Sequence, residues 1–424
     1  MLLPQGDTAR TIVETMPEPH RTDTVTGLLA EIADVGRDRK RGGYSRPVFS
    51  TAERDLRGWF TEHAKRRGLD VHTDLNGILW ASMGDMTAGD SVVTGSHLDS
   101  VPGGGAFDGP LGICSALVAV DRLQERGTAP ARALSIAVFP EEEGSRFGVA
   151  CLGSRLLTGA IDADRARSLR DEDGDTLAEV AAANGLDPRF LGQDDGTLAA
   201  MGTFLELHVE QGRGLVDRAR PVGIARSILG HGRWRITVGG QGNHAGSTLM
   251  ADRRDPMVAA ARIVVAVREA ALAHPDARAT VGRLIPVPGG TNVIASSVDL
   301  WLDVRHPQDE IAASVVERIT IEAGRWAAQE GCTVQVVEES LSGTVHFPSG
   351  LRDRLARILP ESPLLDTGAG HDAGVLSARV ESAMLFVRNP TGVSHSPEEH
   401  VEADDAEAGA IALADALQGL LTRD

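Results

Sequence analysis

The stretch SVVTGSHLDSVPGGGAFDGPLGICSALVAVDRLQER, residues 91–126, joins a short apolar strand (91–95) to a segment with helical periodicity (109–126). Two more apolar strands are predicted further along the chain, over residues 133–139 and 203–209. Strands that alternate with helices in this way predict an α/β fold with a mainly parallel sheet. Functional side chains in such folds gather where the parallel strands end, so the carboxyl end of each strand is a candidate for chemistry.

The pattern changes at about residue 223 and predicts a second, inserted unit. Its predicted elements are, in order, a strand (233–238), a helix (256–273), two strands (279–287 and 297–304), a helix (309–329) and a strand (332–338). This βαββαβ order is that of a ferredoxin-like, split βαβ sandwich. We therefore predict a discontinuous larger domain, residues 1–222 plus 340–424, and an inserted domain at residues 223–339. A buried strand at 382–387 and a terminal helix at 402–421 would complete the larger domain.

The charge balance of the 424-residue chain restricts its partners. The chain has 42 basic and 60 acidic residues and a net charge of −18, which disfavours nucleic acid and anionic membranes as partners. Residues 1–20 lack the continuous apolar stretch of a signal peptide, and no window reaches the ~20 apolar residues that span a bilayer. The three widely spaced cysteines predict neither a disulfide framework nor a cysteine-ligated zinc site. We expect a soluble, cytoplasmic protein.

Residues with the chemistry of metal ligands follow the first two strands. His97 and Asp108 lie on either side of a glycine-rich turn in GSHLDSVPGGGAFDGPLG, and they could meet at one metal ion. A hydrogen-bonded histidine in a polar turn is the alternative for His97 alone. Three consecutive glutamates, residues 141–143, follow the strand 133–139 and repel one another unless a cation compensates. The alternative here is a solvated acidic loop, which the burial expected at that strand end disfavours.

Two further clusters complete the set. His208 and Glu206 share one face of the strand in LELHVEQG, where Gln211 follows, and His395 lies in the polar loop GVSHSPEEH. Nitrogen and carboxylate ligands without thiolates suit zinc, manganese, cobalt or nickel. Four strand-end clusters supply enough ligands for two divalent ions, which would polarise a water between them. A glutamate left over from the ligands would then act as general base.

The inserted unit carries polar residues of its own. Arg305 interrupts a strand that is apolar at alternate positions, so its guanidinium could bind a carboxylate or pair internally with Asp303 or Asp299. His244, in GNHAGS, could be catalytic or could cap a turn. Two more polar residues of this unit are His231 and Asn292.

Seven motifs resemble, in order, those of the amidohydrolases for allantoate and N-carbamoyl-L-amino acids, a branch of the aminoacylase and carboxypeptidase zinc metallopeptidase clan. They are GSHLDSVPGGGAFDGPLG, EEEGSRFG, LELHVEQG, GNHAGST, GTNVI, GAGHDA and SHSPEE. The resemblance runs from about residue 34 to residue 420. It implies a hydrolase domain with a binuclear metal site, an inserted lid domain, and a homodimer formed through the lid.

The resemblance also implies a role for each matching residue. Its metal ligands fall on His97, Asp108, Glu143, His208 and His395, with Asp108 bridging two divalent ions. Asp99 would orient His97, and Glu142 would be the base, although the run of glutamates also allows Glu141 as base with Glu142 as ligand. His244 would stabilise the oxyanion, reaching across from a partner subunit. The substrate-binding positions fall on Gln211, His231, Asn292, Arg305, Gly368 and His371.

One position departs from the resemblance, because allantoate-cleaving relatives have glutamine in the segment that reads LGHGR here, around His231. A neutral histidine donates and accepts in a different geometry from an amide, which weighs against allantoate itself. We expect metal-dependent hydrolysis of the carbamoyl C–N bond of an N-carbamoyl-L-amino acid or ureido acid, whose carboxylate Asn292 and Arg305 would bind. The alternatives are an N-acyl- or N-formyl-amino-acid amidohydrolase or a dipeptidase on the same scaffold, and a non-catalytic binding protein.

Overall fold

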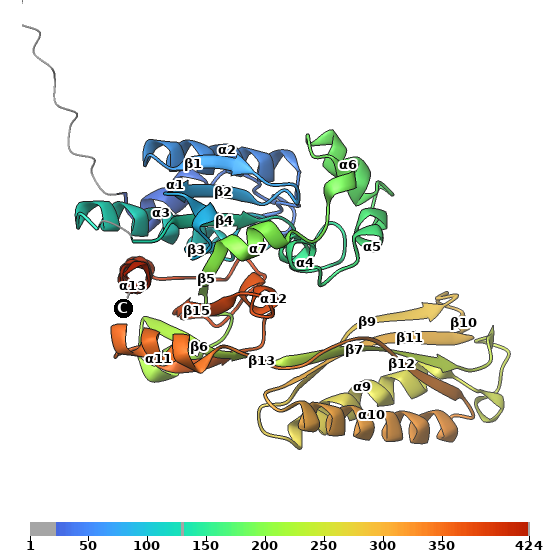
Figure 1. Ribbon diagram of the computed structural model, residues 1–424. Coiled ribbons are helices and arrows are strands. Elements are labelled where there is room, and N and C mark those ends of the chain that lie inside the picture. Colours follow the sequence, from blue (N-terminus) through green and yellow to red (C-terminus); the bar gives the residue numbers. More distant parts are fainter. Residues whose placement is uncertain (1–22, 129–130, 423–424) are drawn as a thin grey trace, which may run out of the picture.

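A computed structural model describes residues 23–128 and 131–422, so the prediction for residues 1–20 lies outside the described residues. The chain forms two bodies, each built on its own sheet (Figure 1). The larger body contains a nine-stranded sheet and the smaller one a four-stranded sheet. In the described ranges, no helix combines the length and the hydropathy needed to cross a membrane.

The centre of the larger sheet is parallel, as predicted. Its four central strands, in spatial order, are β4 (Leu134–Phe139), β3 (Ser91–His97), β5 (Met201–Val209) and β15 (Glu381–Val387). The remaining strands are β1 (Asp70–Thr73) and β2 (Leu79–Met83) on one side, and β6 (Val222–Ile228), β13 (Val345–His346) and β14 (Leu364–Thr367) on the other. β2 and β6 run antiparallel to the central strands that they pair with. The sheet is therefore mixed, with a parallel core.

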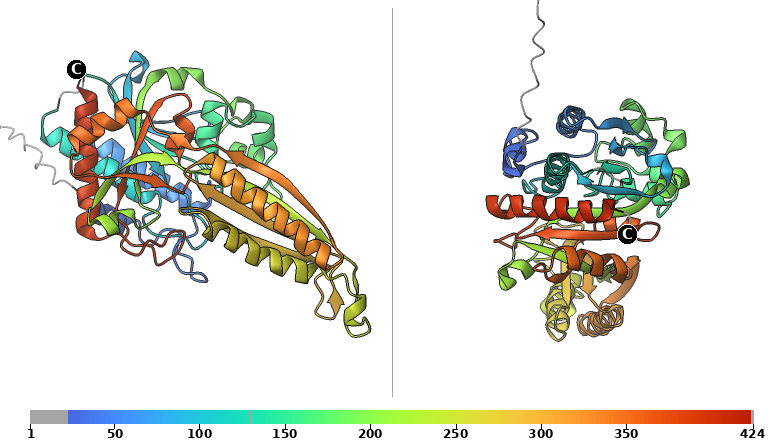
Figure 2. Two further views of the ribbon diagram at one scale, coloured as in Figure 1. Left: turned by 90° about the horizontal axis from the view of Figure 1, so that it is seen from below. Right: turned by 60° about the vertical axis from the view of Figure 1, so that its left-hand side comes forward.

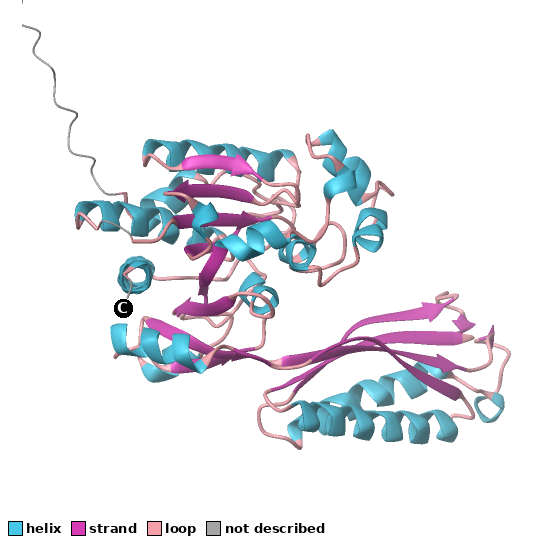
Figure 3. Cartoon of the chain, viewed as in Figure 1, coloured by secondary structure: helices cyan, strands magenta, loops and turns pink. Residues whose placement is uncertain are grey.

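Helices cover both faces of this sheet, which explains why every residue of β3 and β4 is buried (Figure 3). One face packs against α1 (Val25–Glu31), α2 (Thr51–Arg66), α3 (Pro110–Glu125), α11 (Ser349–Ile358) and α13 (Ala403–Leu421). The other face packs against α4 (Leu152–Thr158), α7 (Asp195–Ala200), α8 (Gly214–Arg218) and α12 (Asp372–Leu376). Helices α5 (Ala163–Ser168) and α6 (Leu177–Ala183) form a small separate core with α4.

The smaller body has the βαββαβ order predicted from the sequence. Its elements are β7 (Gly230–Gly239), α9 (Pro256–Leu272), β9 (Arg278–Val287), β11 (Ser297–His306), α10 (Asp309–Gln329) and β12 (Thr333–Ser342). The strands are all antiparallel, in the order β12-β7-β11-β9. The two helices lie side by side on one face of the sheet (Figure 2), and alternate residues of β11 are buried beneath them. No helix of the described residues covers the other face of the sheet.

A short two-stranded antiparallel sheet extends this smaller body. β8 (Asn243–His244) pairs with β10 (Val293–Ile294). Figure 1 shows β10 at the end of the smaller body that is remote from the larger sheet.

The chain passes from the larger sheet to the smaller one, and later back again, close to the predicted boundaries of the insert. β6 belongs to the larger sheet and only Leu229 separates it from β7, while β12 continues to Ser342 before β13 returns to the larger sheet. The sequence has no turn signal between β6 and β7, because one apolar strand runs directly into the next. The division at residues 223 and 339, and the lid role of the insert, stay predictions.

Candidate metal centre and active site

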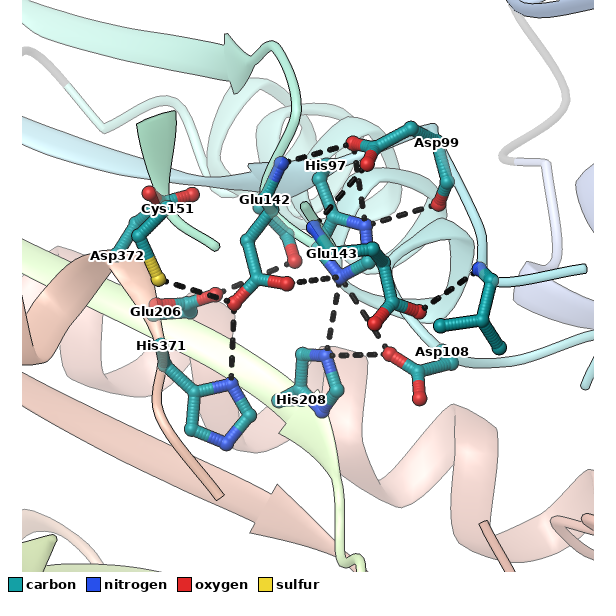
Figure 4. A network of polar contacts seen from close by, with 12 residues as sticks. His97, Asp99, Asp108, Glu142, Glu143, Cys151, Glu206, His208, His371 and Asp372 are labelled. Atoms are coloured by element: carbon teal, nitrogen blue, oxygen red, sulfur yellow. Dashed lines mark hydrogen bonds and ion pairs between the residues drawn. The ribbon is translucent and has the colours of Figure 1, made fainter. Parts of the chain in front are cut away.

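The predicted ligands meet at the carboxyl edge of the parallel strands (Figure 4). His97 is the last residue of β3 and is paired in register with Phe139, so the glutamates that follow β4 lie beside it. Asp108 precedes α3, and Gly109 between them has a φ of 86°. A Cβ at Gly109 would lie 2.6 Å from the His97 ring, so only glycine allows this close approach.

The first group of ligand atoms consists of His97, His208 and Asp108, all buried. The two imidazole Nε2 atoms are 3.4 Å apart. Asp108 Oδ1 lies 3.4 Å from Nε2 of His97 and 3.2 Å from Nε2 of His208. The second group consists of Asp108, Glu143 and His395. Here His395 Nε2 lies 3.3 Å from Glu143 Oε2 and 3.6 Å from Asp108 Oδ2. Asp108 therefore belongs to both groups, one carboxylate oxygen facing each.

Backbone carbonyls fix which nitrogen of each buried ring faces the first group. His97 Nδ1 is 3.0 Å from the carbonyl oxygen of Asp99, and His208 Nδ1 is 3.0 Å from that of Val209. A ring that donates from Nδ1 to a carbonyl presents the lone pair of Nε2 as a ligand. Two Nε2 lone pairs and a carboxylate oxygen then face one another at 3.2–3.4 Å, an arrangement that a proton or a metal ion between them would stabilise. The donor set fits a divalent metal ion.

The pKa shifts of the buried residues also indicate that the site attracts positive charge. Burial alone would lower the pKa of His97, but Glu142, Asp108 and Asp99 raise it well above its usual value. Burial raises the pKa of Glu143 well above its usual value, and the nearby Asp108 carboxylate adds to the shift. The cluster of acids thus attracts positive charge, whether as protons or as a metal ion, because several buried carboxylates cannot all stay ionised without compensation.

Glu142 and Glu141 have different surroundings. Glu142 Oε2 lies 3.7 Å from His97 Nε2, yet Glu142 is in neither ligand group. Glu141, with a φ of 56°, instead accepts hydrogen bonds from the backbone N–H groups of Arg146 and Phe147. The left-handed conformation at Glu141 turns its side chain away from the site, and this favours the frame with Glu142 as base and Glu143 as ligand.

Asp99 connects these residues. Its carboxylate accepts hydrogen bonds from the backbone N–H groups of Glu142 at 3.2 Å and Glu143 at 3.1 Å, and lies 3.7 Å from His97 Nδ1. One buried side chain therefore sets the position of a candidate ligand and of the strand-end turn that carries the other acids.

His371 and Gln211 both lie at the cluster. The ring of His371 packs 4.4 Å from that of His208, and its Nδ1 is 4.0 Å from Glu142 Oε1. Burial and the neighbouring His208 hold the pKa of His371 well below its usual value. Gln211 Nε2 donates to Asp108 Oδ2 at 2.9 Å. In the described part of the chain, neither ring nitrogen of His371 has a hydrogen-bond partner.

Sequence reasoning missed three residues at the site. Glu399 accepts hydrogen bonds from the backbone N–H groups of Phe107 and Asp108, and Ser394 Oγ donates to Asp108 Oδ2 at 3.2 Å. Both lie in the SHSPEE motif, which supplied the signal. The Cys151 thiol lies 3.5 Å from Glu142 Oε1, and no local pattern in the sequence distinguishes this cysteine from the other two.

The structure brings Arg305, His231 and Gly368 together. Arg305 is opposite His231 on the neighbouring strand, and its Nη1 donates to the carbonyl oxygen of Gly368. The internal ion pair considered from the sequence is also present: Nε and Nη2 of Arg305 contact the two carboxylate oxygens of Asp303 at 2.7 and 3.0 Å. Arg305 and Gly368 border a groove of about 820 Å³ between the two bodies, which also reaches His395.

His244 and Asn292 lie together but away from the metal ligands of their own chain. His244 is in β8 and Asn292 directly precedes β10 of the two-stranded sheet, and the backbone N–H of Ala245 donates to the carbonyl oxygen of Asn292 at 2.9 Å. His244 Nδ1 accepts hydrogen bonds from the backbone N–H groups of Gly246 and Ser247 at 3.1 and 3.2 Å. The turn-capping alternative is therefore realised through Nδ1, while the side chain is exposed.

Known proteins resemble this chain over most of its length. The profile described as peptidase family M20/M25/M40 matches residues 93–419. The N-carbamoyl-L-amino acid amidohydrolase of Geobacillus stearothermophilus is 35% identical over 392 residues, covering 91% of this chain and 95% of that protein. The allantoate amidohydrolase of Bacillus subtilis is 31% identical over 408 residues, covering 94% and 97%. A crystal structure of an amidase of the hydantoinase/carbamoylase family from Burkholderia vietnamiensis has a TM-score of 0.83 and 30% identity, covering 94% and 97%.

Proposed function

The chain belongs to peptidase family M20/M25/M40, and from this premise we propose that it hydrolyses the carbamoyl C–N bond of an N-carbamoyl-L-amino acid or a related ureido acid. The names of its curated relatives support this reaction class. The observation that carries the proposal is the pair of ligand groups that share Asp108, with Glu142 beside them and in neither group. This arrangement suits a hydrolase better than a binding protein, because a carboxylate is left over to move a proton.

Five residues would hold two divalent ions: His97, Asp108, Glu143, His208 and His395. Two such ions, when bound, lower the pKa of a water and polarise the carbonyl of the substrate. Zinc, manganese, cobalt and nickel all match the nitrogen and oxygen donors. Asp99 would keep His97 and Glu143 in place through the contacts described above.

Glu142 would act as general base. Its carboxylate would take the proton of the attacking water and deliver it to the leaving nitrogen, a role for which a base must lie within hydrogen-bond reach of the water. The Cys151 thiol, 3.5 Å from Oε1, leaves Oε2 facing the ligands. Glu142 thus has one oxygen held on the protein side and one directed toward the reacting water.

Both bodies would supply groups that hold the substrate. Arg305 and Asn292 would bind its carboxylate, with Gly368, His231, Gln211 and His371 lining the pocket. A neutral His244 carries its proton on Nε2, because Nδ1 accepts two backbone hydrogen bonds, so Nε2 can donate to an oxyanion. Since His244 and Asn292 lie at the remote two-stranded sheet, they would act on the site of a second copy in a homodimer.

The base assignment is tested by Glu142→Gln with Glu141→Gln as its matched control. We expect Glu142→Gln to lower kcat by about 100-fold or more while leaving the metal content unchanged. In Glu141→Gln the new amide keeps a carbonyl oxygen that can accept from Arg146 and Phe147, so this variant should keep most of its activity. Activity should be measured with N-carbamoyl, N-formyl and N-acetyl amino acids and with allantoate, in the presence of manganese or zinc. Substantial turnover by Glu142→Gln would contradict the role of Glu142.

The shared site is tested by mixing two inactive variants, Glu142→Gln and His244→Ala, after reversible dissociation. If His244 serves the partner's site, each mixed dimer has one intact site, and statistical mixing restores about a quarter of the wild-type activity. If His244 serves its own chain, every site in the mixture carries a defect and no activity returns. Light scattering on the same samples gives the oligomeric state.

A further inference from the structure

Two arginines stand side by side on the helix-free face of the smaller sheet. Arg278, the first residue of β9, is directly opposite Arg305 of β11, and Arg305 is opposite His231 of β7. Directly opposite residues on neighbouring strands point to the same face, and like charges in such positions destabilise a sheet. The three side chains therefore form a row of basic groups across three strands, with nothing in the strand pairing to compensate it.

The two arginines differ in their partners. Arg305 is neutralised by Asp303, which contacts it through both carboxylate oxygens. Arg278 makes no hydrogen bond and no ion pair with any residue of the described ranges, including Asp276 two positions earlier. Its side chain nevertheless reaches the same loop as Arg305, because its Nη1 would lie 3.5 Å from a Cβ built at Gly368. Both guanidinium groups thus converge on Gly368.

The groove between the two bodies contains both arginines. It has a volume of about 820 Å³ and runs from Arg278 and Arg305 past Gly368 to His395, one of the candidate ligands. Four acids border it: Asp366 pairs with Arg226, Glu210 accepts from the backbone N–H groups of Gly214 and Leu215, and Asp217 and Asp276 are the other two. An unpaired guanidinium therefore borders the groove beside the position proposed for the substrate carboxylate.

From this juxtaposition we infer that Arg278 binds a second anionic group, so that the preferred substrates are ureido acids with an acidic side chain. N-carbamoyl-L-aspartate and N-carbamoyl-L-glutamate have this chemistry, with one carboxylate for Arg305 and one for Arg278. The guanidinium fork suits a carboxylate, and the second anion would also relieve the repulsion between the paired arginines. The inference rests on the proposed function and specifies the substrate class of that same site.

Matched substrates that differ only in the charged group test this inference. We expect the metal-loaded wild-type enzyme to favour N-carbamoyl-L-aspartate over N-carbamoyl-L-asparagine in kcat/KM by about tenfold or more, the effect of one charge-assisted contact. Arg278→Gln should bring this ratio close to one and leave the rate with the asparagine derivative unchanged. The control is Arg268→Gln, which removes an exposed arginine of α9 that does not border the groove, and it should alter neither rate.

Two outcomes would overturn the inference. The wild type could have a higher kcat/KM with N-carbamoyl-L-asparagine than with N-carbamoyl-L-aspartate, or Arg278→Gln could lower kcat/KM equally with both substrates. The second outcome would mean that Arg278 serves the shared carboxylate. If no N-carbamoyl amino acid is hydrolysed with any metal, the proposed function itself fails. Binding then still tests Arg278, because succinate should raise the Tm of the wild-type protein more than butyrate does, and Arg278→Gln should abolish that difference.

Discussion

Asp99 gives the sharpest test of how the site is held together, through the substitution Asp99→Asn. The Asp99 carboxylate accepts from the backbone N–H groups of both Glu142 and Glu143, one on each oxygen. Asparagine has nearly the same shape, but one of its two terminal groups is an NH₂ that cannot accept. Whichever way the amide is turned, one of the two N–H groups loses its partner and faces another donor.

The size of the effect follows from this loss. A buried N–H left without a partner costs about 1–3 kcal/mol, and the loss of a carboxylate that orients a ligand weakens metal binding by roughly 10- to 100-fold. Both the cost of the unpaired N–H and the weaker metal binding apply to Asp99. Its carboxylate contacts the turn that carries Glu143 and lies 3.7 Å from Nδ1 of His97. We therefore expect Asp99→Asn to bind zinc or manganese about 10- to 100-fold more weakly than the wild type.

The measurement is a competition titration against a chromophoric chelator, with metal content checked by elemental analysis. The matched control is Asp74→Asn in the β1–β2 loop. Oδ1 of Asp74 accepts from the backbone N–H groups of Asn76 and Ile78, and Oδ2 accepts from the indole N–H of Trp80, so an amide here also leaves a donor without its partner. That variant should lose stability toward urea but keep its metal affinity. The reasoning is refuted if Asp99→Asn binds metal within twofold of the wild type, or if Asp74→Asn weakens metal binding as much.

Three further predictions concern the base, the metal and pH. Cys151→Ala should lower kcat by about two- to tenfold at unchanged KM, because the thiol donates a weak hydrogen bond to Glu142 Oε1. Cys151→Ser should restore kcat. A change in KM alone would contradict the role of Cys151 in positioning Glu142. Removing metal with a chelator should abolish turnover and lower Tm by about 5 °C, since the buried acids lose their compensating charge. Adding zinc or manganese should restore both turnover and Tm. An unchanged Tm after chelation would contradict this prediction. Burial, and then Arg66, lower the pKa of His63 in the folded state, so the unfolded state takes up the proton first. The urea midpoint of the wild type should therefore fall as pH drops below about 6.5, and the midpoint of His63→Gln should fall less. An equal fall in the wild type and in His63→Gln would contradict this effect of His63.

The meeting of His97, Glu143 and His208 could be predicted from the sequence, because each of these candidate ligands lies at or close to a strand end that is recognisable locally. His97 follows an apolar run, and the glutamates follow another, so the general rule for parallel sheets brings them to one edge. The choice among the three glutamates could not be made in this way. It depends on the conformation of the turn, in which Glu141 has a φ of 56° and its side chain accepts from the backbone N–H groups of Arg146 and Phe147.

Contacts between distant segments escaped prediction for a different reason. Cys151 reaches Glu142 because α4 begins directly behind the glutamate turn, and its backbone N–H also donates to the Glu142 carbonyl oxygen. Glu399 reaches the turn before α3 across 291 residues of sequence. Neither contact has a local periodicity or spacing that would reveal it. The same holds for His244 and Asn292, whose proposed partners belong to a second chain.

The net charge of −18 would suggest that the protein repels carboxylates, yet the placement of the charges argues otherwise. Electrostatic interactions weaken within about 10 Å at ordinary salt, so the groups that border the groove decide binding and the total does not. Asp303 pairs with Arg305 and so reduces the net attraction of Arg305 for the substrate carboxylate. Arg278 has no such partner among the described residues and lies on the same row of the sheet. Affinity for an anion therefore depends on this second arginine and on the dications that the ligand groups would hold, and an acidic side chain is the substrate feature that would use it.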